Sequence, residues 1–148
     1  MKKIFSNIVI PQIVYYEFRS RLDDEKYRTI KSLRRSKFVL LEDFEVGSPE
    51  HKLYKKLTKG IECSCRGRCE SAAITIAKYR NYTILSNNDC ECVHEYNLDK
   101  ISVIETLQNA YDNEMINIDE AEIIWSNIKK SNQEIINISF KDYISMER

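Results

Sequence analysis

Glycine and proline are scarce in this sequence, with three Gly and two Pro in 148 residues. So few turn-forming residues argue against a sandwich or barrel of many short strands. No stretch approaches the ~20 apolar residues that a membrane-spanning helix needs. The basic start is followed by only a short apolar run before Pro11, which does not fit a secretory signal peptide. We therefore expect a cytoplasmic protein without a membrane span.

Net charge is also absent, since 23 Lys and Arg balance 23 Asp and Glu. The balance hides an asymmetry, because residues 1–80 carry a net charge of +8 and residues 81–148 carry −8. Such a split suggests a surface for a polyanion, a protein partner or a neighbouring copy, unless the fold mixes the two halves. Residues 26–37 are heavily basic and indicate either a solvated helix face or contacts to phosphates.

What the sequence does contain is an alternation of short apolar runs and helical patterns. The expected strands are residues 8–11, 38–41, 82–85 and 101–104, and the expected helices are 12–22, 26–36, 49–59, 69–80, 92–97, 106–115 and 118–130. Asp23 and Ser48 are expected to cap helices, with Pro49 following Ser48 at the first helical position. The alternation predicts an α/β fold in one domain, residues 1–148, with a parallel sheet and helices on both faces.

The stretch 66–89 places polar groups at two informative positions. Glu70 stands at the start of a helix, and residues 86–89, Ser-Asn-Asn-Asp, follow a buried strand directly. In open α/β sheets, ligands bind outside the carboxyl ends of the strands. Glu17 lies one turn into an earlier helix, beside Val14 and Phe18, where a carboxylate is usually paired unless other acids converge on it. We expect these groups to face one cleft.

Three segments resemble the PIN domain, the metal-dependent ribonuclease fold of many bacterial toxins and RNA-processing nucleases. Residues 9–17 read as strand, proline and helix with Glu17. Residues 67–74, Gly-Arg-Cys-Glu-Ser-Ala-Ala-Ile, are similar to the family's Gly-x-Gly-Glu-x-x-Ala-Ile pattern. Residues 84–89, Ile-Leu-Ser-Asn-Asn-Asp, resemble the family's polar Thr/Ser-Asn-Asp sequence at the end of a strand. The likeness covers residues 8–115, and residues 116–148 are expected to form a helical tail.

The resemblance implies a three-layer parallel sheet and an acidic site for Mg²⁺ or Mn²⁺. By the resemblance, the site residues are Glu17, Glu70, Asp89 and Asn88. The ions position an attacking water and neutralise charge on the phosphodiester. The implied function is that of a toxin-like endoribonuclease acting on RNA, with an antitoxin-like protein or a second copy as partner.

Two departures from the family pattern support an alternative. The family's central first strand, which carries an Asp, has no counterpart here, and Asn87 or Asn88 stands where a carboxylate is expected. The alternative is a non-catalytic PIN-like domain that binds RNA or protein. The family's strand order, 3-2-1-4-5, implies that residues 8–10 pair directly with residues 82–85 or that another strand fills the gap. We expect direct pairing or a strand from a partner chain rather than the apolar tail.

Five cysteines fall in two clusters, Cys63, Cys65 and Cys69 in one and Cys90 and Cys92 in the other. The odd number and the lack of an export signal argue against a disulfide framework and favour free thiols. Both clusters precede or follow candidate site residues, so we expect them to be neighbours at one sheet edge. Zn²⁺ or an iron–sulfur cluster is the alternative use, and redox chemistry a third, although the spacing is not that of a common zinc knuckle.

Overall fold

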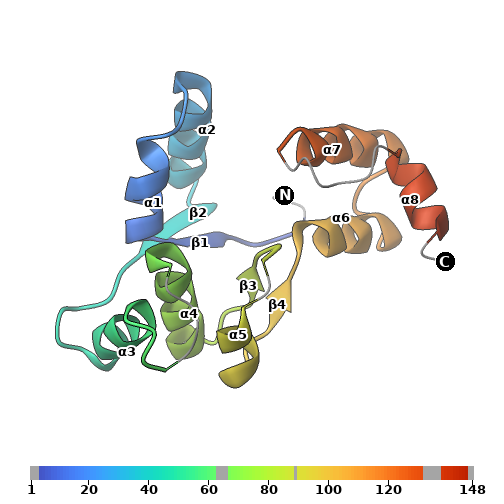
Figure 1. The fold of residues 1–148 in the computed structure, drawn as a ribbon. Helices are drawn as coiled ribbons and strands as arrows, with labels where there is room; N and C mark the ends of the chain where they lie inside the picture. Colours follow the sequence, from blue (N-terminus) through green and yellow to red (C-terminus); the bar gives the residue numbers. More distant parts are fainter. Residues whose placement is uncertain (1–3, 63–66, 89, 132–137, 147–148) are drawn as a thin grey trace. The chain divides into compact units, whose positions relative to one another are not determined.

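The chain forms two compact units, Met1–Ile101 and Ser102–Arg148. The structure, a computed structural model, describes residues 4–62, 67–88, 90–131 and 138–146 (Figure 1). The first unit contains β1 (Ile8–Pro11), α1 (Gln12–Arg19), α2 (Asp24–Arg35), β2 (Val39–Glu42), α3 (Pro49–Thr58), α4 (Arg68–Arg80), β3 (Ile84–Leu85), α5 (Glu91–Glu95) and β4 (Lys100–Ile101). The second contains α6 (Val103–Asp112), α7 (Ile118–Ser131) and α8 (Phe140–Met146).

Side chains cap α2 and α3, and α2 begins at Asp24, two residues before its predicted start. Asp23 Oδ1 accepts a hydrogen bond of 2.8 Å from the backbone N–H of Lys26. Ser48 Oγ accepts one of 3.1 Å from the backbone N–H of His51. These oxygens satisfy N–H groups that have no partner within the first helical turn. Helix α4 ends at its carboxyl side with Asn81. This residue adopts the left-handed conformation, with φ of 55°, that commonly terminates helices.

The strands form two separate parallel pairs. β1 pairs with β2 from Ile8↔Val39 to Pro11↔Glu42, and β3 pairs with β4 as Ile84↔Lys100 and Leu85↔Ile101. The mixed α/β class and the parallel pairing are therefore confirmed. The described strands do not join into one sheet, so the predicted direct pairing of residues 8–10 with residues 82–85 is wrong. Each of β1 and β3 is hydrogen-bonded to one neighbouring strand among the described residues.

The predicted fourth strand, residues 101–104, is wrong in its second half. β4 ends at Ile101, and Val103 begins α6. A capping box explains the early helix start. Ser102 Oγ accepts from the backbone N–H of Glu105 at 3.0 Å, and Glu105 Oε2 accepts from the backbone N–H of Ser102 at 2.7 Å. This reciprocal pair favours helix immediately after Ser102 over further strand.

Helix α4 is the element against which the first unit packs. It contacts α1, α3, β1 and β3. Small side chains permit this close approach, since Ala72 is 0% exposed and Ala77 is 3% exposed. One part of the core combines Leu53 and Leu57 of α3 with Ile74 of α4 and Cys92 of α5. Burial of such apolar side chains contributes roughly 1.5–3 kcal/mol each.

The second unit has an aromatic core. Trp125 of α7 and Phe140 of α8 are both buried, with ring centroids 5.6 Å apart. Tyr111 of α6 meets Phe140 edge-on at 5.6 Å. The indole N–H of Trp125 donates to the backbone oxygen of Ile138 at 3.0 Å, so its polar atom is satisfied. Across the described ranges, no helix has the length and apolar character to span a membrane.

Candidate functional site

The end of α1 meets the start of α4 through a contact between residues far apart in the sequence. The thiol of Cys69 donates a hydrogen bond to Glu17 Oε2, with 3.0 Å between sulfur and oxygen. Glu17 is in the last turn of α1, which follows β1 directly, and Cys69 is in the first turn of α4. Glu70 is the next residue of that turn. The structure thus brings Glu17 into contact with the first turn of α4, the turn that also carries Glu70. A shared site for the two carboxylates stays a prediction.

Gly67 leaves room for the carboxylate of Glu70 at this helix start. A Cβ built on Gly67 would lie 2.9 Å from Glu70 Oε2, so the Glu70 side chain folds back over the position that a larger residue would occupy. Gly67 is the N-cap residue of α4 and makes no side-chain cap. A carboxylate in the first turn is also favoured by the partial positive charge of the helix start.

Two arginines share the neighbourhood of Glu17. Arg21 forms an ion pair with Glu17 at 3.3 Å, and the side chains of the two residues are 75% and 46% exposed. Hydrogen bonding to Tyr54 and, more weakly, the charge of Glu17 raise the pKa of Arg68. Both guanidinium groups place positive charge near Glu17. The sequence could have indicated Arg21, because residues four apart on a helix are neighbours.

Cys69 is a thiol rather than a thiolate at neutral pH. Desolvation by burial, followed by the hydrogen bond to Glu17 and the negative charge of Glu17, raises the pKa of Cys69 from 9.0 to about 11. A protonated thiol donates to the carboxylate and orients it. The nucleophile and the metal ligand in cysteine chemistry is the thiolate, so this state does not favour either role for Cys69.

The other two predicted site residues, Asn88 and Asp89, have no described contact with Glu17 or Glu70. Asn88 is exposed, and its backbone N–H donates to Ser86 Oγ at 3.1 Å, in the turn that follows β3. Asp89 lies outside the described residues. Within the residues that the structure describes, no three His, Cys, Asp or Glu side chains are grouped to hold a metal ion. The convergence of Asn88 or Asp89 on Glu17 and Glu70 stays a prediction.

The cysteines differ from the expectation of five free thiols. Cys90 and Cys92 are each disulfide-bonded, whereas Cys69 is free. Cys63 and Cys65 lie outside the described residues. A sulfur in a disulfide cannot act as a thiolate ligand, so a zinc or iron–sulfur site would require the reduced state of Cys90 and Cys92. The metal use of these cysteines stays a prediction for the reduced protein.

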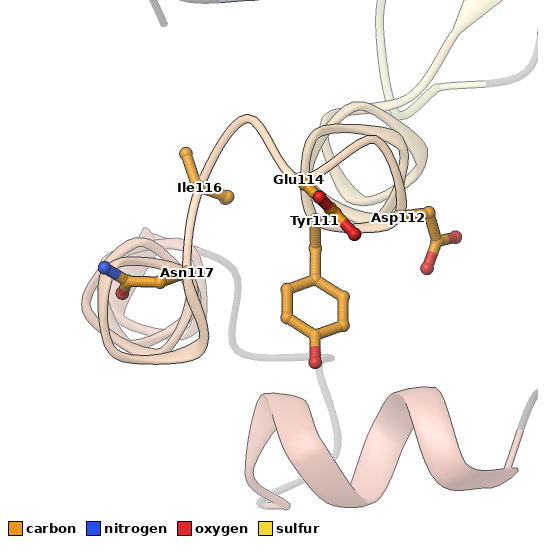
Figure 2. A pocket seen from close by; sticks show the side chains of 5 residues that line it. All are labelled: Tyr111, Asp112, Glu114, Ile116 and Asn117. Atoms are coloured by element: carbon orange, nitrogen blue, oxygen red, sulfur yellow. The ribbon is translucent and has the colours of Figure 1, made fainter.

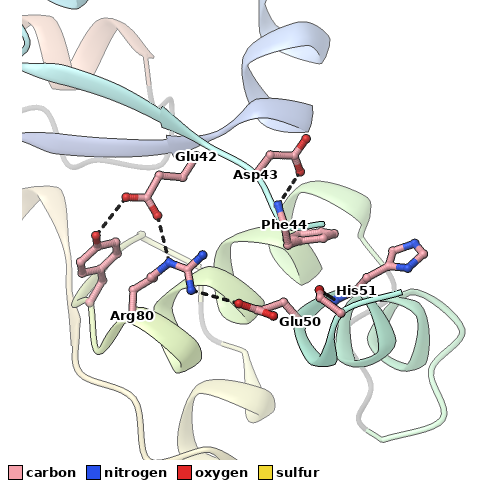
Figure 3. A network of polar contacts seen from close by, with 8 residues as sticks. Glu42, Asp43, Phe44, Glu50, His51 and Arg80 are labelled. Carbon is pink, nitrogen blue, oxygen red and sulfur yellow. Dashed lines mark hydrogen bonds and ion pairs between the residues drawn. The ribbon is translucent and has the colours of Figure 1, made fainter. Parts of the chain in front are cut away.

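A second polar cluster, at the carboxyl end of α4, was not predicted from the sequence (Figure 3). Arg80 Nη1 donates to Glu50 Oε1 at 3.0 Å, and Arg80 Nε forms an ion pair with Glu42 Oε2 at 3.5 Å. The hydroxyl of Tyr82 donates to Glu42 Oε1 at 3.0 Å. One guanidinium thus connects the end of β2 with the start of α3. Because both carboxylates pair with the same guanidinium, this cluster holds the three elements together.

Two hollows are present in the described parts of the chain. In the second unit, a pocket of about 420 Å³ is lined by Tyr111, Asp112, Glu114, Ile116 and Asn117 (Figure 2). Asn117 caps α7 by accepting from the backbone N–H of Glu120 at 2.9 Å. In the first unit, a groove of about 350 Å³ runs between α1 and α2, with Phe18, Leu22 and Ile30 among its walls. Neither hollow contains a predicted site residue.

The chain matches no protein-family model, no curated protein and no solved structure at a significant level. The resemblance to the PIN domain therefore rests on the motifs at residues 9–17, 67–74 and 84–89. The structure shows the mixed α/β class only. The three-layer PIN-like sheet, the activity, the metal and the partners stay predictions.

Proposed function

We propose that this protein is a PIN-like, metal-dependent endoribonuclease whose carboxylates are Glu17 and Glu70. The observation that carries the proposal is the 3.0 Å contact between Cys69 and Glu17, made across 52 residues of sequence. It brings the carboxylate of α1 to the helix start that bears Glu70. This contact supports a shared site in which two separate helices each supply one carboxylate.

The donor chemistry of these residues fits Mg²⁺ or Mn²⁺. Hard cations of this size prefer oxygen ligands, and Mg²⁺ is commonly held by one or two carboxylates together with waters and substrate phosphates. Both Glu17 and Glu70 are exposed, so water and RNA can reach them. A bound ion of this kind would supply an activated water and compensate charge on the scissile phosphodiester. Asp89 and Asn88 are the candidates for further oxygen ligands.

The other residues of the site have roles that follow from their contacts. The thiol of Cys69 fixes the orientation of the Glu17 carboxylate by donating to one of its oxygens. Arg21 and Arg68 supply positive charge that favours the approach of an RNA phosphate. Gly67 keeps space open for the Glu70 carboxylate. None of these roles requires the Arg80 cluster, which lies at the opposite end of α4.

A non-catalytic PIN-like domain that binds RNA is the second candidate. The ion pair between Glu17 and Arg21 favours it, because a guanidinium competes with a metal ion for the same carboxylate. In this case the basic residues would bind phosphates and no bond would break. The two candidates share RNA as the ligand and differ only in cleavage.

Incubation of purified protein with single-stranded RNA and Mn²⁺ tests the first proposal. We expect cleavage that EDTA stops, and we expect Glu70→Gln and Glu17→Gln each to reduce the rate by at least about a hundredfold. Glu45→Gln, an exposed carboxylate outside the site, is the matched control and should cleave normally. Intact RNA with the unaltered protein, or cleavage that persists in both site variants, would refute the nuclease and leave the binding domain.

A further inference from the structure

Helix α2 has an exposed basic face that makes no contribution to the core. Five of its twelve residues are Lys or Arg, and none of its residues is buried. Arg28, Lys31 and Arg35 share one face at a spacing of i, i+3 and i+7. All three are exposed, and none forms an ion pair with another residue in the described part of the chain. This face therefore has charge that intramolecular contacts do not neutralise.

Beside this face, two arginines lie on tyrosine rings between α1 and α2. The guanidinium of Arg34 is 4.9 Å from the ring centroid of Tyr15, and its Nη1 donates to the Tyr15 hydroxyl at 3.2 Å. Arg19 lies 5.5 Å from the ring centroid of Tyr27. Stacking holds a guanidinium plane in a fixed orientation, and its remaining N–H groups suit the oxygens of a phosphate. These arginines extend the positive charge of α2 onto α1.

An exposed aromatic ring adjoins the stacked pair. Tyr16 is 56% exposed, and its ring centroid is 5.9 Å from that of Tyr15, on which Arg34 lies. Its hydroxyl accepts a hydrogen bond of 3.1 Å from Gln12 Nε2, which orients the ring. An oriented, solvent-exposed ring beside basic side chains is the combination that binds single-stranded nucleic acid, through base stacking and phosphate contacts.

We propose that the exposed face of α2 and the adjoining edge of α1 bind single-stranded RNA. Arg28, Lys31 and Arg35 contact the phosphates, and Tyr16 stacks on a base. The inference rests on the proposed function in taking RNA as the ligand, and it adds a binding surface distinct from Glu17 and Glu70. The alternative occupant is an acidic protein surface, such as the negative half of a second copy. RNA is favoured because an acidic protein would make no use of the exposed ring beside the charges.

Fluorescence anisotropy with a labelled, mixed-sequence RNA of about 15 nucleotides, in EDTA, tests the surface without cleavage. The variant Arg28→Gln, Lys31→Gln, Arg35→Gln removes three charges from α2. Its matched control is Lys52→Gln, Lys55→Gln, Lys59→Gln, which removes three exposed charges at the same spacing from α3 and its cap. We expect the α2 variant to bind at least about tenfold more weakly. The slope of log K against log salt should fall by about 2, since each phosphate contact contributes about 0.7.

The control should change affinity by less than about twofold, because its charges lie outside the proposed surface. Equal weakening by the two variants, or no binding by the unaltered protein, would overturn the inference. Size-exclusion chromatography tests whether a second copy of the chain binds this face instead. A dimer that dissociates only in the α2 variant, together with absent RNA binding, would assign the face to a second copy and refute RNA.

Variants of Tyr16 distinguish the contribution of base stacking to RNA binding from that of charge. Tyr16→Ala should weaken RNA binding about tenfold, whereas Tyr16→Phe, which keeps the ring, should bind nearly normally. Equal losses in both variants would refute stacking by Tyr16. The two proposals fail separately, because Glu70→Gln should abolish cleavage and keep EDTA-independent RNA binding. Binding without cleavage refutes only the nuclease, and normal binding by the α2 variant refutes only this surface.

Discussion

At its carboxyl end helix α4 places Arg80 between Glu42 and Glu50, whereas at its amino end it places Cys69 beside Glu17. At the carboxyl end one guanidinium pairs with two carboxylates and connects three elements. The carboxylates at the amino end are exposed, and Glu70 has space around it because Gly67 lacks a side chain. One end of the helix thus carries charges in mutual ion pairs, and the other carries or contacts the exposed carboxylates that we propose as a site. Each prediction below tests one side of this difference.

Gly67→Ala should have the largest effect and should act on activity. The new Cβ would lie 2.9 Å from Glu70 Oε2, so the carboxylate must move while remaining in the protein. The clash is with the flexible end of the Glu70 side chain, so the shift is small. We expect a loss of about tenfold in the RNA cleavage that we propose. Gly67→Ser should reduce the rate similarly but cap α4 better. Normal cleavage by both variants would show that the position of Glu70 is unimportant.

Alkylation of Cys69 tests the contact with Glu17. A pKa of about 11 rather than 9.0 makes the thiolate about a hundredfold rarer at neutral pH. We expect iodoacetamide to modify Cys69 slowly, at a rate that rises with pH until the pH passes about 11. Mass spectrometry of the peptide that contains Cys69 measures this rate. Glu17→Gln removes the negative charge and should shift the midpoint to lower pH, while burial keeps it above 9.0. An unchanged midpoint in that variant would argue against the contact.

These two predictions concern residues of which only some could be identified from the sequence. The motifs identified Glu17 and Glu70, because carboxylates after a strand and at a helix start are visible in the sequence. The contact between Cys69 and Glu17 spans 52 residues and depends on how α1 packs against α4. Local patterns carry no information on such a distance. The ion pair of Arg21 with Glu17 is local and was accessible from the spacing alone.

Arg80→Ala should act on stability instead of activity. Removal of the guanidinium leaves Glu42 and Glu50 without their cation, and the ends of β2 and α3 lose their connection to α4. We expect a loss of about 1 kcal/mol in unfolding free energy, because these side chains remain partly hydrated. Urea denaturation measures it. Arg35→Ala, an exposed arginine outside any described ion pair, is the control and should change stability little.

The same cluster predicts an acid dependence of stability. A hydrogen bond from its own backbone N–H, then one from Arg80, hold the pKa of Glu50 below 4.5. A lowered folded-state pKa stabilises the protein above the unfolded value and loses that stabilisation as pH falls through the folded value. The urea midpoint should therefore decrease below about pH 4.5, and this decrease should be smaller in Arg80→Ala. Parallel pH profiles for the two proteins would contradict the assignment.

Ser71→Ala should have the smallest effect and the opposite sign. Ser71 is 0% exposed, and its hydroxyl has no hydrogen-bond partner among the described residues. Loss of a buried, unsatisfied hydroxyl should be neutral or stabilise the protein by up to about 1 kcal/mol. Thr75→Val is the contrast, because Thr75 Oγ1 donates to the Ser71 carbonyl at 2.7 Å, and it should destabilise by about 1 kcal/mol. Calorimetry distinguishes the two, and a destabilised Ser71→Ala would mean that the hydroxyl has a partner.

Prediction of the fold was most accurate where single residues decide the structure locally. Asp23 and Ser48 fixed the starts of α2 and α3 through side-chain oxygens, and Pro49 suits the first position of α3. Ser102 and Glu105 offered the same kind of signal, which was overlooked in favour of the apolar run at residues 101–104. The pairing of strands was harder, because register depends on the packing of distant segments. The expectation that residues 8–10 pair with residues 82–85 failed for that reason.

The two short parallel pairs also bear on how this protein behaves at high concentration. Within the described part of the chain, β1 and β3 are each hydrogen-bonded to one strand, so neither has a strand partner on its second side there. Exposed strand edges are templates for self-association, and natural proteins protect them with charge, proline or covering segments. Pro11 removes one donor from β1, whereas Leu85 of β3 is apolar and 38% exposed. Aggregation during expression or concentration should therefore begin at β3, and Leu85→Lys is the substitution to suppress it.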